Sequence, residues 1–215
     1  MNTNSTFLRY ATIVSFCFLG FSFTVLAQQP SQASYKTTYK AEKAGEFMKN
    51  WWIAGPFDVA TQPGMPADSL QEAVFRQDLI TGVIAVKNKI IPPVQFSGRQ
   101  FNWQLITSPY DAVDLDSLYK QKDFAYAYAF AEIVAPAPVS VLLAVGSDDA
   151  IKVWHNGKLV HQNFLPRGLI KDNDLVPLKL EKGSNQLLLK VQDMERGWGF
   201  SARLLDKKSM TDQLN

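Results

Sequence analysis

A strict alternation of large and small apolar residues over FAYAYAFAEIV, residues 124–134, constrains this fold more than any other stretch. Successive side chains of a β-strand point to opposite faces, so the alternate aromatic residues share one face and the intervening alanines share the other. The aromatic residues are Phe124, Tyr126, Tyr128 and Phe130. Because neither face is polar, we expect a central strand covered on both sides. We expect the aromatic face to fill the core between two sheets, with a loop or the leading segment against the alanines.

Short apolar segments separated by turn signals fill the rest of the chain, at roughly the 8 to 12-residue spacing of an all-β sandwich or barrel. The predicted strands are residues 47–53, 101–106, 124–134, 139–145, 151–155, 158–162, 175–180, 186–192 and 198–205. Residues 66–78, with Asp68 as the cap, and residues 112–119 are predicted short helices or helical turns. The sequence therefore predicts an all-β sandwich with one or two short helices.

The N-terminus has the layout of a secretory signal peptide. An uncharged apolar run, residues 11–27, follows Arg9 and ends in small or apolar residues. The run is at the lower limit of the length that spans a bilayer, so we expect cleavage and no remaining membrane span. Residues 1–27 are the predicted signal peptide, and the protein is expected to be secreted, either into a periplasm or out of the cell.

Polar segments border the predicted domain. Residues 28–46 lack helical or strand periodicity and are predicted to be a flexible leader. The β-sandwich domain is predicted to occupy residues 47–206, and residues 207–215 are a polar tail.

Composition excludes several classes of function. Cys17, the single cysteine, lies in the predicted signal peptide, so the mature chain has no disulfide bond. The 22 basic and 20 acidic residues are nearly balanced, which argues against a surface for nucleic acid or anionic membrane. The sequence contains no nucleophile elbow, His-Glu-x-x-His motif, phosphate loop or Rossmann glycine fingerprint, so we expect no enzymatic activity.

The segment GSDDAIKVWHNGKLV, residues 146–160, is predicted to include a β-hairpin. The Asn-Gly pair at 156–157, between two β-rich runs, is a strong signal for a tight turn. If Ile151 and Val153 face the core, the period of two turns Trp154 to the other face. Trp154 is therefore the predicted exposed platform for a ligand.

Four segments occur in a characteristic order: WWIAGPFD (51–58), FAYAYAFAEI (124–133), the hairpin segment (146–160) and the closing strands (180–204). In this order they resemble secreted β-sandwich modules of the galactose-binding-domain-like type. The resemblance implies a jelly-roll fold and, as in many members of that family, carbohydrate binding. The chain departs from the family pattern where Ala150 replaces a commoner glycine and His155 replaces a commoner apolar residue.

Sugar sites combine an aromatic face with a few polar groups. The candidate ligand-binding residues, around the hairpin and the loop of residues 163–174, are Trp154, His155, Asn156, Arg167 and Trp198. We therefore expect a non-catalytic carbohydrate-binding protein. The alternative is a structural module whose aromatic edge docks onto another exported protein. A solvent-facing Trp154 would favour carbohydrate binding, and a buried Trp154 would favour docking.

Asp148 and Asp149 also resemble the adjacent aspartates of PA14-type lectin modules, which a cis peptide joins and which hold a sugar-binding calcium ion. Calcium needs six to eight oxygen ligands, and adjacent side chains of an extended strand point apart. Two interpretations follow. In the first, Asp148 and Asp149 hold calcium. In the second, one of them accepts hydrogen bonds from backbone amides at the end of the strand while the other is solvated.

Overall fold

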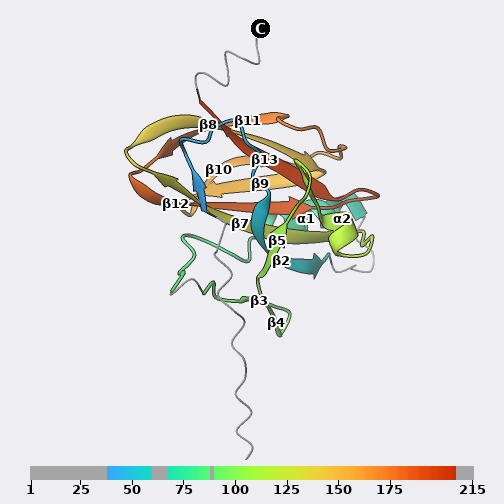
Figure 1. Ribbon diagram of the computed structural model, residues 1–215. Coiled ribbons are helices and arrows are strands. Elements are labelled where there is room, and N and C mark those ends of the chain that lie inside the picture. The colour runs from blue at the N-terminus through green and yellow to red at the C-terminus, as the bar shows by residue number, and fades with distance from the viewer. Residues whose placement is uncertain (1–37, 60–66, 88–89, 207–215) are drawn as a thin grey trace, which may run out of the picture. The chain divides into compact units, whose positions relative to one another are not determined.

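The computed structural model describes residues 38–59, 67–87 and 90–206 (Figure 1). The predicted signal peptide 1–27, the first part of the predicted leader (28–37) and the polar tail 207–215 lie outside the described residues. Among the described residues, no helix has the length and apolar character needed to cross a membrane.

The larger sheet, called sheet A here, has seven strands. They are β1 (Thr38–Lys40), β2 (Asn50–Asp58), β5 (Gln104–Thr107), β7 (Ala125–Ala135), β9 (Ala150–His155), β10 (Lys158–Asn163) and β12 (Gly183–Gln192). Their order is β10-β9-β12-β7-β2-β5, and β1 pairs in parallel with β7. The prediction that residues 124–134 form a central strand is confirmed, because β7 lies between β12 and β2.

The smaller sheet, called sheet B, packs over sheet A (Figure 1). It contains β6 (Val113–Asp114), β8 (Val139–Asp148), β11 (Asp174–Leu180) and β13 (Gly199–Leu205), in the order β11-β8-β13-β6. The remaining elements are the hairpin of β3 (Val94–Phe96) and β4 (Arg99–Phe101), and the helices α1 (Ala67–Arg76) and α2 (Leu115–Leu118). The predicted all-β sandwich with two short helices is confirmed.

The helix caps differ from the prediction in one case. Helix α1 begins at Ala67, so Asp68 is already inside the helix and is not its cap. The cap of α2 is Asp114, whose Oδ1 accepts a hydrogen bond from the Ser117 amide at 2.8 Å. This bond satisfies one of the free amides of the first helical turn.

The two faces of β7 are reversed relative to the prediction. The alanine face, with Ala127 and Ala129, lies in the core between the sheets, where large residues of sheet B such as Leu143 pack against it. The aromatic face, with Tyr126 and Tyr128, lies on the outer side of sheet A in a second apolar cluster. Alternation shows which side chains share a face, but the packing partners decide which face is inside.

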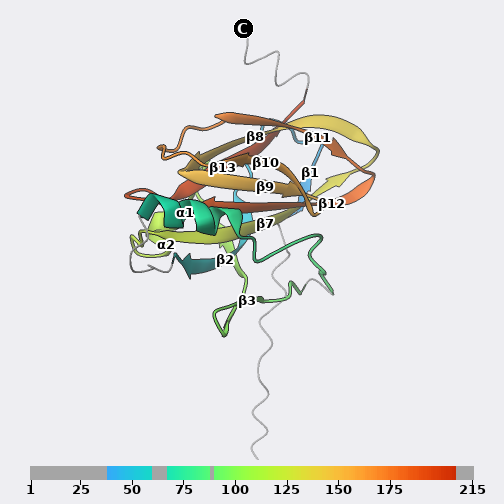
Figure 2. The same ribbon diagram turned by 180° about the vertical axis from the view of Figure 1, so that it is seen from behind.

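The outer side of sheet A is covered by α1 and the segment that leads from it to β5 (Figure 2). Helix α1 docks partly through a buried lysine of β12. Lys190 is 0% exposed, and its Nζ donates to the carbonyl oxygens of Val74 at 2.7 Å, Phe75 at 3.3 Å and Gln77 at 2.5 Å. Burial lowers the pKa of Lys190 to about 7. The free carbonyls at the end of α1 thereby receive a donor from the sheet.

Residues 38–46 belong to the sandwich, so that part of the leader prediction is wrong. Thr38 to Lys40 pair with Glu132 to Val134 of β7, and the Gly45 amide donates to the Leu204 carbonyl at 2.7 Å. A strand of three residues is too short to show an alternation pattern, which is why the sequence did not indicate it.

Candidate functional site

The predicted hairpin forms, but its tryptophan is not exposed. Asn156 and Gly157 have φ values of 48° and 76°, the left-handed conformations that a tight two-residue hairpin turn requires. Trp154 does turn away from the core between the sheets, as the period of two predicts, yet it is 6% exposed. Its ring lies 6.3 Å from that of Tyr128, beneath the segment that covers sheet A. The prediction of an exposed platform at Trp154 is therefore wrong.

His155 and Asn156 hold the hairpin to the neighbouring strand β12. His155 Nε2 lies 3.3 Å from Oδ1 of the buried Asn185, and Asn156 Nδ2 donates to the same oxygen at 3.1 Å. Asn156 Oδ1 accepts a bond from the Gln186 amide at 2.7 Å. These two predicted ligand residues thus have hydrogen-bond partners within the fold.

Asp149 binds backbone amides from two loops at once. Its Oδ1 accepts from the Arg167 amide at 2.9 Å, in the β10–β11 loop (residues 164–173). Its Oδ2 accepts from the Met194 amide at 2.6 Å and the Glu195 amide at 3.3 Å, in the β12–β13 loop (residues 193–198). This arrangement matches the interpretation in which one aspartate bonds amides at the strand exit.

The adjacent aspartates differ from the cis-linked, calcium-holding pair that the resemblance to PA14-type modules implied. The Asp148–Asp149 peptide bond is trans, and both carboxylate oxygens of Asp149 already accept amide bonds. Burial and the charge of Asp149 raise the pKa of Asp148, which disfavours its ionised form. Within the described part of the chain, no group of three or more histidine, cysteine or acidic side chains is placed to hold a metal.

Arg167 and Trp198 also have internal partners. Arg167 forms a two-pronged ion pair with Asp174, with Nη1–Oδ1 at 3.2 Å and Nη2–Oδ2 at 2.6 Å, and Nη2 donates to Ser147 Oγ at 2.8 Å. Burial opposes the ionisation of Asp174, but the bond and charge of Arg167 hold its pKa below the usual range. Trp198 is buried, and its Nε1 donates to the Val191 carbonyl at 3.3 Å.

A cavity of about 600 Å³ lies beside Asp149, at the end of the sandwich where the two loops meet α1. Its walls come from five separate segments: α1, the residue before β7, Asp149 between β8 and β9, the β10–β11 loop and the β12–β13 loop. The residues that give it chemical character are Gln71, Phe124, Phe164, Met194, Glu195 and Arg196. Asp149 lines this cavity, so one predicted residue belongs to it, and the predicted loop supplies Phe164.

The cavity combines aromatic and polar groups. Phe124 is 41% exposed and Phe164 is half-buried, while Glu195 and Arg196 are exposed. Gln71 is 4% exposed, and its Nε2 has no hydrogen-bond partner although its Oε1 accepts from Gln192 Nε2 at 2.7 Å. A mostly apolar hollow with a few directed polar groups is typical of small-ligand sites, and its volume is within their usual range.

Three of the cavity residues have a left-handed backbone: Phe124 with φ 55°, Asp149 with φ 56° and Arg196 with φ 76°. Non-glycine residues rarely adopt this conformation, and such strain gathers at functional sites when surrounding bonds enforce it. Here the Phe124 amide donates to Asp193 Oδ2 at 2.9 Å, and the Arg196 amide donates to Asp123 Oδ1 at 3.3 Å.

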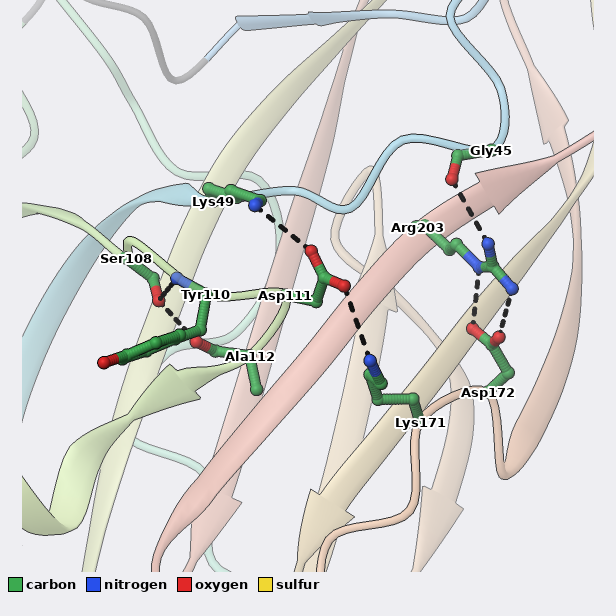
Figure 3. A network of polar contacts seen from close by, with 9 residues as sticks. All are labelled: Gly45, Lys49, Ser108, Tyr110, Asp111, Ala112, Lys171, Asp172 and Arg203. Carbon is green, nitrogen blue, oxygen red and sulfur yellow. Dashed lines mark hydrogen bonds and ion pairs between the residues drawn. The ribbon is translucent and has the colours of Figure 1, made fainter.

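A network of ion pairs and hydrogen bonds holds the end of the β10–β11 loop that leads into β11 (Figure 3). Arg203 of β13 pairs with Asp172 and donates from Nη1 to the Gly45 carbonyl at 3.2 Å. Lys171 Nζ lies 3.4 Å from Oδ2 of Asp111, whose other oxygen lies 3.1 Å from Lys49 Nζ. The loop that carries Phe164 is therefore held at two places, by Asp149 at Arg167 and by this network at residues 171 and 172.

The β10–β11 loop packs closely against β8 at Gly146. A Cβ atom at Gly146 would lie 2.0 Å from the Ile170 carbonyl oxygen, so Gly146→Ala forces the loop away from β8. We expect a loss of about 1 to 3 kcal/mol of unfolding free energy in urea denaturation, as for other overpacked sites. Gly168→Ala, in the same loop but with open space around it, is the matched control and should change stability by less than about 0.5 kcal/mol. Equal losses in the two variants would contradict this packing.

No family model and no curated protein matches the sequence. Among solved structures, the chain is similar to part of the β-glucosidase from Kluyveromyces marxianus in complex with glucose, with 14% identity over 56% of this chain and a TM-score of 0.42. A GH31 α-xylosidase from Xanthomonas citri gives 15% identity over 49% and a TM-score of 0.35. A GH2 β-galacturonidase from Eisenbergiella tayi bound to glycerol gives 15% over 52% and 0.37. The chain covers 17%, 12% and 22% of those proteins respectively, so each similarity is partial.

Proposed function

We propose that the mature chain is an exported, non-catalytic carbohydrate-binding β-sandwich whose ligand occupies the cavity beside Asp149. The observation that carries the proposal is the meeting of an exposed phenylalanine, Phe124, with the polar side chains of Gln71, Glu195 and Arg196 in one cavity of about 600 Å³. A pyranose packs its apolar face on an aromatic ring and offers hydroxyls to amide, carboxylate and guanidinium groups. Glu195 and Arg196 supply the last two at the cavity wall.

The carboxylates around the cavity support binding without cleavage. Glycoside hydrolysis needs two carboxyl groups on either side of the bond that breaks. Asp149 and Asp193 are both buried, and their oxygens accept backbone amide bonds, whereas Glu195 is exposed at the cavity. Export rests on the predicted signal peptide, residues 1–27.

A glycan-binding screen tests the proposal. The mature chain, residues 28–215, is tested against immobilised polysaccharides, both neutral and uronic-acid-containing, in parallel with calcium and with a chelator. We expect binding to at least one polysaccharide at equal strength in the two buffers, because both Asp149 oxygens are engaged by amides. Binding that disappears in chelator would return Asp148 and Asp149 to the role of calcium ligands, and a lack of binding in both buffers would refute the proposal.

Phe124→Ala removes the exposed aromatic wall. We expect affinity for the polysaccharide found in the screen to fall at least about tenfold, which corresponds to about 1.4 kcal/mol. The matched control is Tyr110→Ala, which removes an aromatic side chain that is 73% exposed but does not line the cavity. Affinity should be unchanged in the control. An equal loss in both variants, or none in Phe124→Ala, would place the ligand elsewhere.

The second candidate is a module that docks onto another exported protein, and the burial of Trp154 favours it over a site at the hairpin. Exposed apolar side chains are present on sheet B, where Leu175 of the edge strand β11 and Val139 of β8 are accessible. Retention of an exported partner by the mature chain, together with a screen that detects no glycan, would establish this function instead.

A further inference from the structure

We propose that Asp193 is a positioning residue that sets the aromatic wall of the cavity by holding Phe124 in its left-handed backbone conformation. The proposal rests on the proposed function, because it assigns a purpose to the exposed ring of Phe124. Asp193 itself is 1% exposed and does not line the cavity, so it acts on a ligand only through Phe124.

The backbone of Phe124 decides where its ring lies. If residue 124 continued the extended strand β7, its side chain would share the outer face of sheet A with Tyr126 and Tyr128. With φ at 55°, Phe124 instead leaves the strand pattern and its ring lines the cavity. A bulky side chain disfavours this conformation, so neighbouring groups must enforce it.

Two hydrogen bonds enforce the conformation of Phe124. Its amide donates to Asp193 Oδ2 at 2.9 Å, and its carbonyl accepts from the Val59 amide at 2.9 Å. The Asp193 amide in turn donates to the Ala125 carbonyl at 2.8 Å. Asp193 follows directly after β12, where Gln192 pairs with Tyr126, so its carboxylate sits opposite the residue that precedes β7. Asp193 therefore fixes the backbone just before β7 and, with it, the position of Phe124 at the cavity.

The charges around Asp193 make the bond to Phe124 sensitive to pH. Asp148 is the last residue of β8 and Asp149 follows it, Asp123 lies in the segment before β7, and the loop of Asp193 itself carries the exposed Glu195 and Arg196. Burial, with the charges of Asp149, Asp123 and Asp148, raises the pKa of Asp193 to about 7. An ionised carboxylate is a stronger acceptor than a protonated one, so the hold on Phe124 strengthens as the pH rises through this value.

The first test needs no ligand. The amide resonance of Phe124 in the mature chain is followed by NMR between about pH 5 and pH 9, a range that spans the raised pKa of Asp193. We expect a shift with a midpoint near 7, and no such shift in Asp193→Asn, which keeps an acceptor oxygen but cannot ionise. Asp123→Asn removes a nearby carboxylate that instead binds the Arg196 amide, so the Phe124 resonance should still titrate, with its midpoint moved to lower pH because one of the charges that raise the pKa of Asp193 is gone. A Phe124 resonance that does not titrate, or that titrates equally in Asp193→Asn, overturns the proposal.

The second test separates positioning from a general effect on folding. Asp193→Asn should retain affinity for the screened polysaccharide to within about twofold, whereas Asp193→Leu, which has no acceptor, should lose about as much as Phe124→Ala, about tenfold. In the Phe124→Ala background, Asp193→Leu should cause no further loss. An additive loss in that double variant overturns the proposal, provided that thermal denaturation shows the variants folded. If no polysaccharide binds, the proposed function fails while the NMR titration still decides the role of Asp193.

Discussion

Asp149→Ala is expected to lower the free energy of unfolding by about 3 to 5 kcal/mol, the largest effect among the variants considered, because a buried charged acceptor and its partners are separated. The carboxylate of Asp149 receives three amide bonds, from Arg167, Met194 and Glu195. Its loss leaves amides of two loops without their acceptor at the cavity, although the bond from the Asp149 amide to the Arg167 carbonyl remains. Urea denaturation monitored by tryptophan fluorescence measures the change.

Asp148→Ala is the matched control for this variant. Asp148 is the adjacent carboxylate and has a backbone hydrogen bond to Leu169, but burial and the charge of Asp149 outweigh that bond, raise its pKa and so disfavour its ionised form. Removing it should change stability by less than about 1 kcal/mol. If the two alanine variants lose equal stability, the loops are not held by Asp149 as the hydrogen bonds indicate.

Lys190→Met is expected to cost about 2 to 4 kcal/mol of unfolding free energy, because the variant removes the buried donor that three backbone carbonyls at the end of α1 share. A buried ion pair can often be replaced by apolar residues on both sides, but the partners of Lys190 are the carbonyls of Val74, Phe75 and Gln77, which no side-chain change removes. Lys179→Met, at an exposed position of β11, is the control and should be nearly neutral. Comparable losses in the two variants would contradict the docking of α1 on Lys190.

The same residue gives a pH dependence with a definite sign. Burial lowers the pKa of Lys190 from 10.5 to about 7, so between these values the unfolded chain binds more protons than the folded chain. Stability from this group therefore rises with pH in that window, and Lys190→Met should flatten the rise. Asp193 acts in the opposite sense at lower pH: its pKa is raised from 3.8 to about 7, so stability from it falls as the pH rises between those values.

The strands and the hairpin could be predicted because their signals are local. Alternation over residues 124–134 and the Asn-Gly pair at 156–157 each specify a conformation from neighbouring residues alone. The predicted core position of Tyr126 and the predicted exposure of Trp154 were wrong because both depend on what covers the outer side of sheet A, and the covering segment after α1 is an irregular run with weak periodicity. A period of two cannot tell an exposed face from one that a distant segment covers.

The candidate site could be predicted only in part. The acidic pair and the loop of residues 163–174 were indicated, and Asp149 and Phe164 do meet at the cavity. Gln71 and Met194 come from segments far apart in the sequence, so no local motif joins them. The left-handed backbone of Phe124 takes its ring out of the strand pattern, and it depends on a hydrogen bond to Asp193 that the sequence does not reveal.

The most direct test of the central claim, that the cavity beside Asp149 is the ligand site, is an amide NMR titration of the mature chain with the strongest-binding oligosaccharide from the screen. The proposed site predicts the largest shift changes at Phe124, Phe164 and residues 194–196, with small changes at the hairpin turn. Changes that centre on residues 154–157, with the cavity amides unaffected, would contradict it and return the ligand to the hairpin.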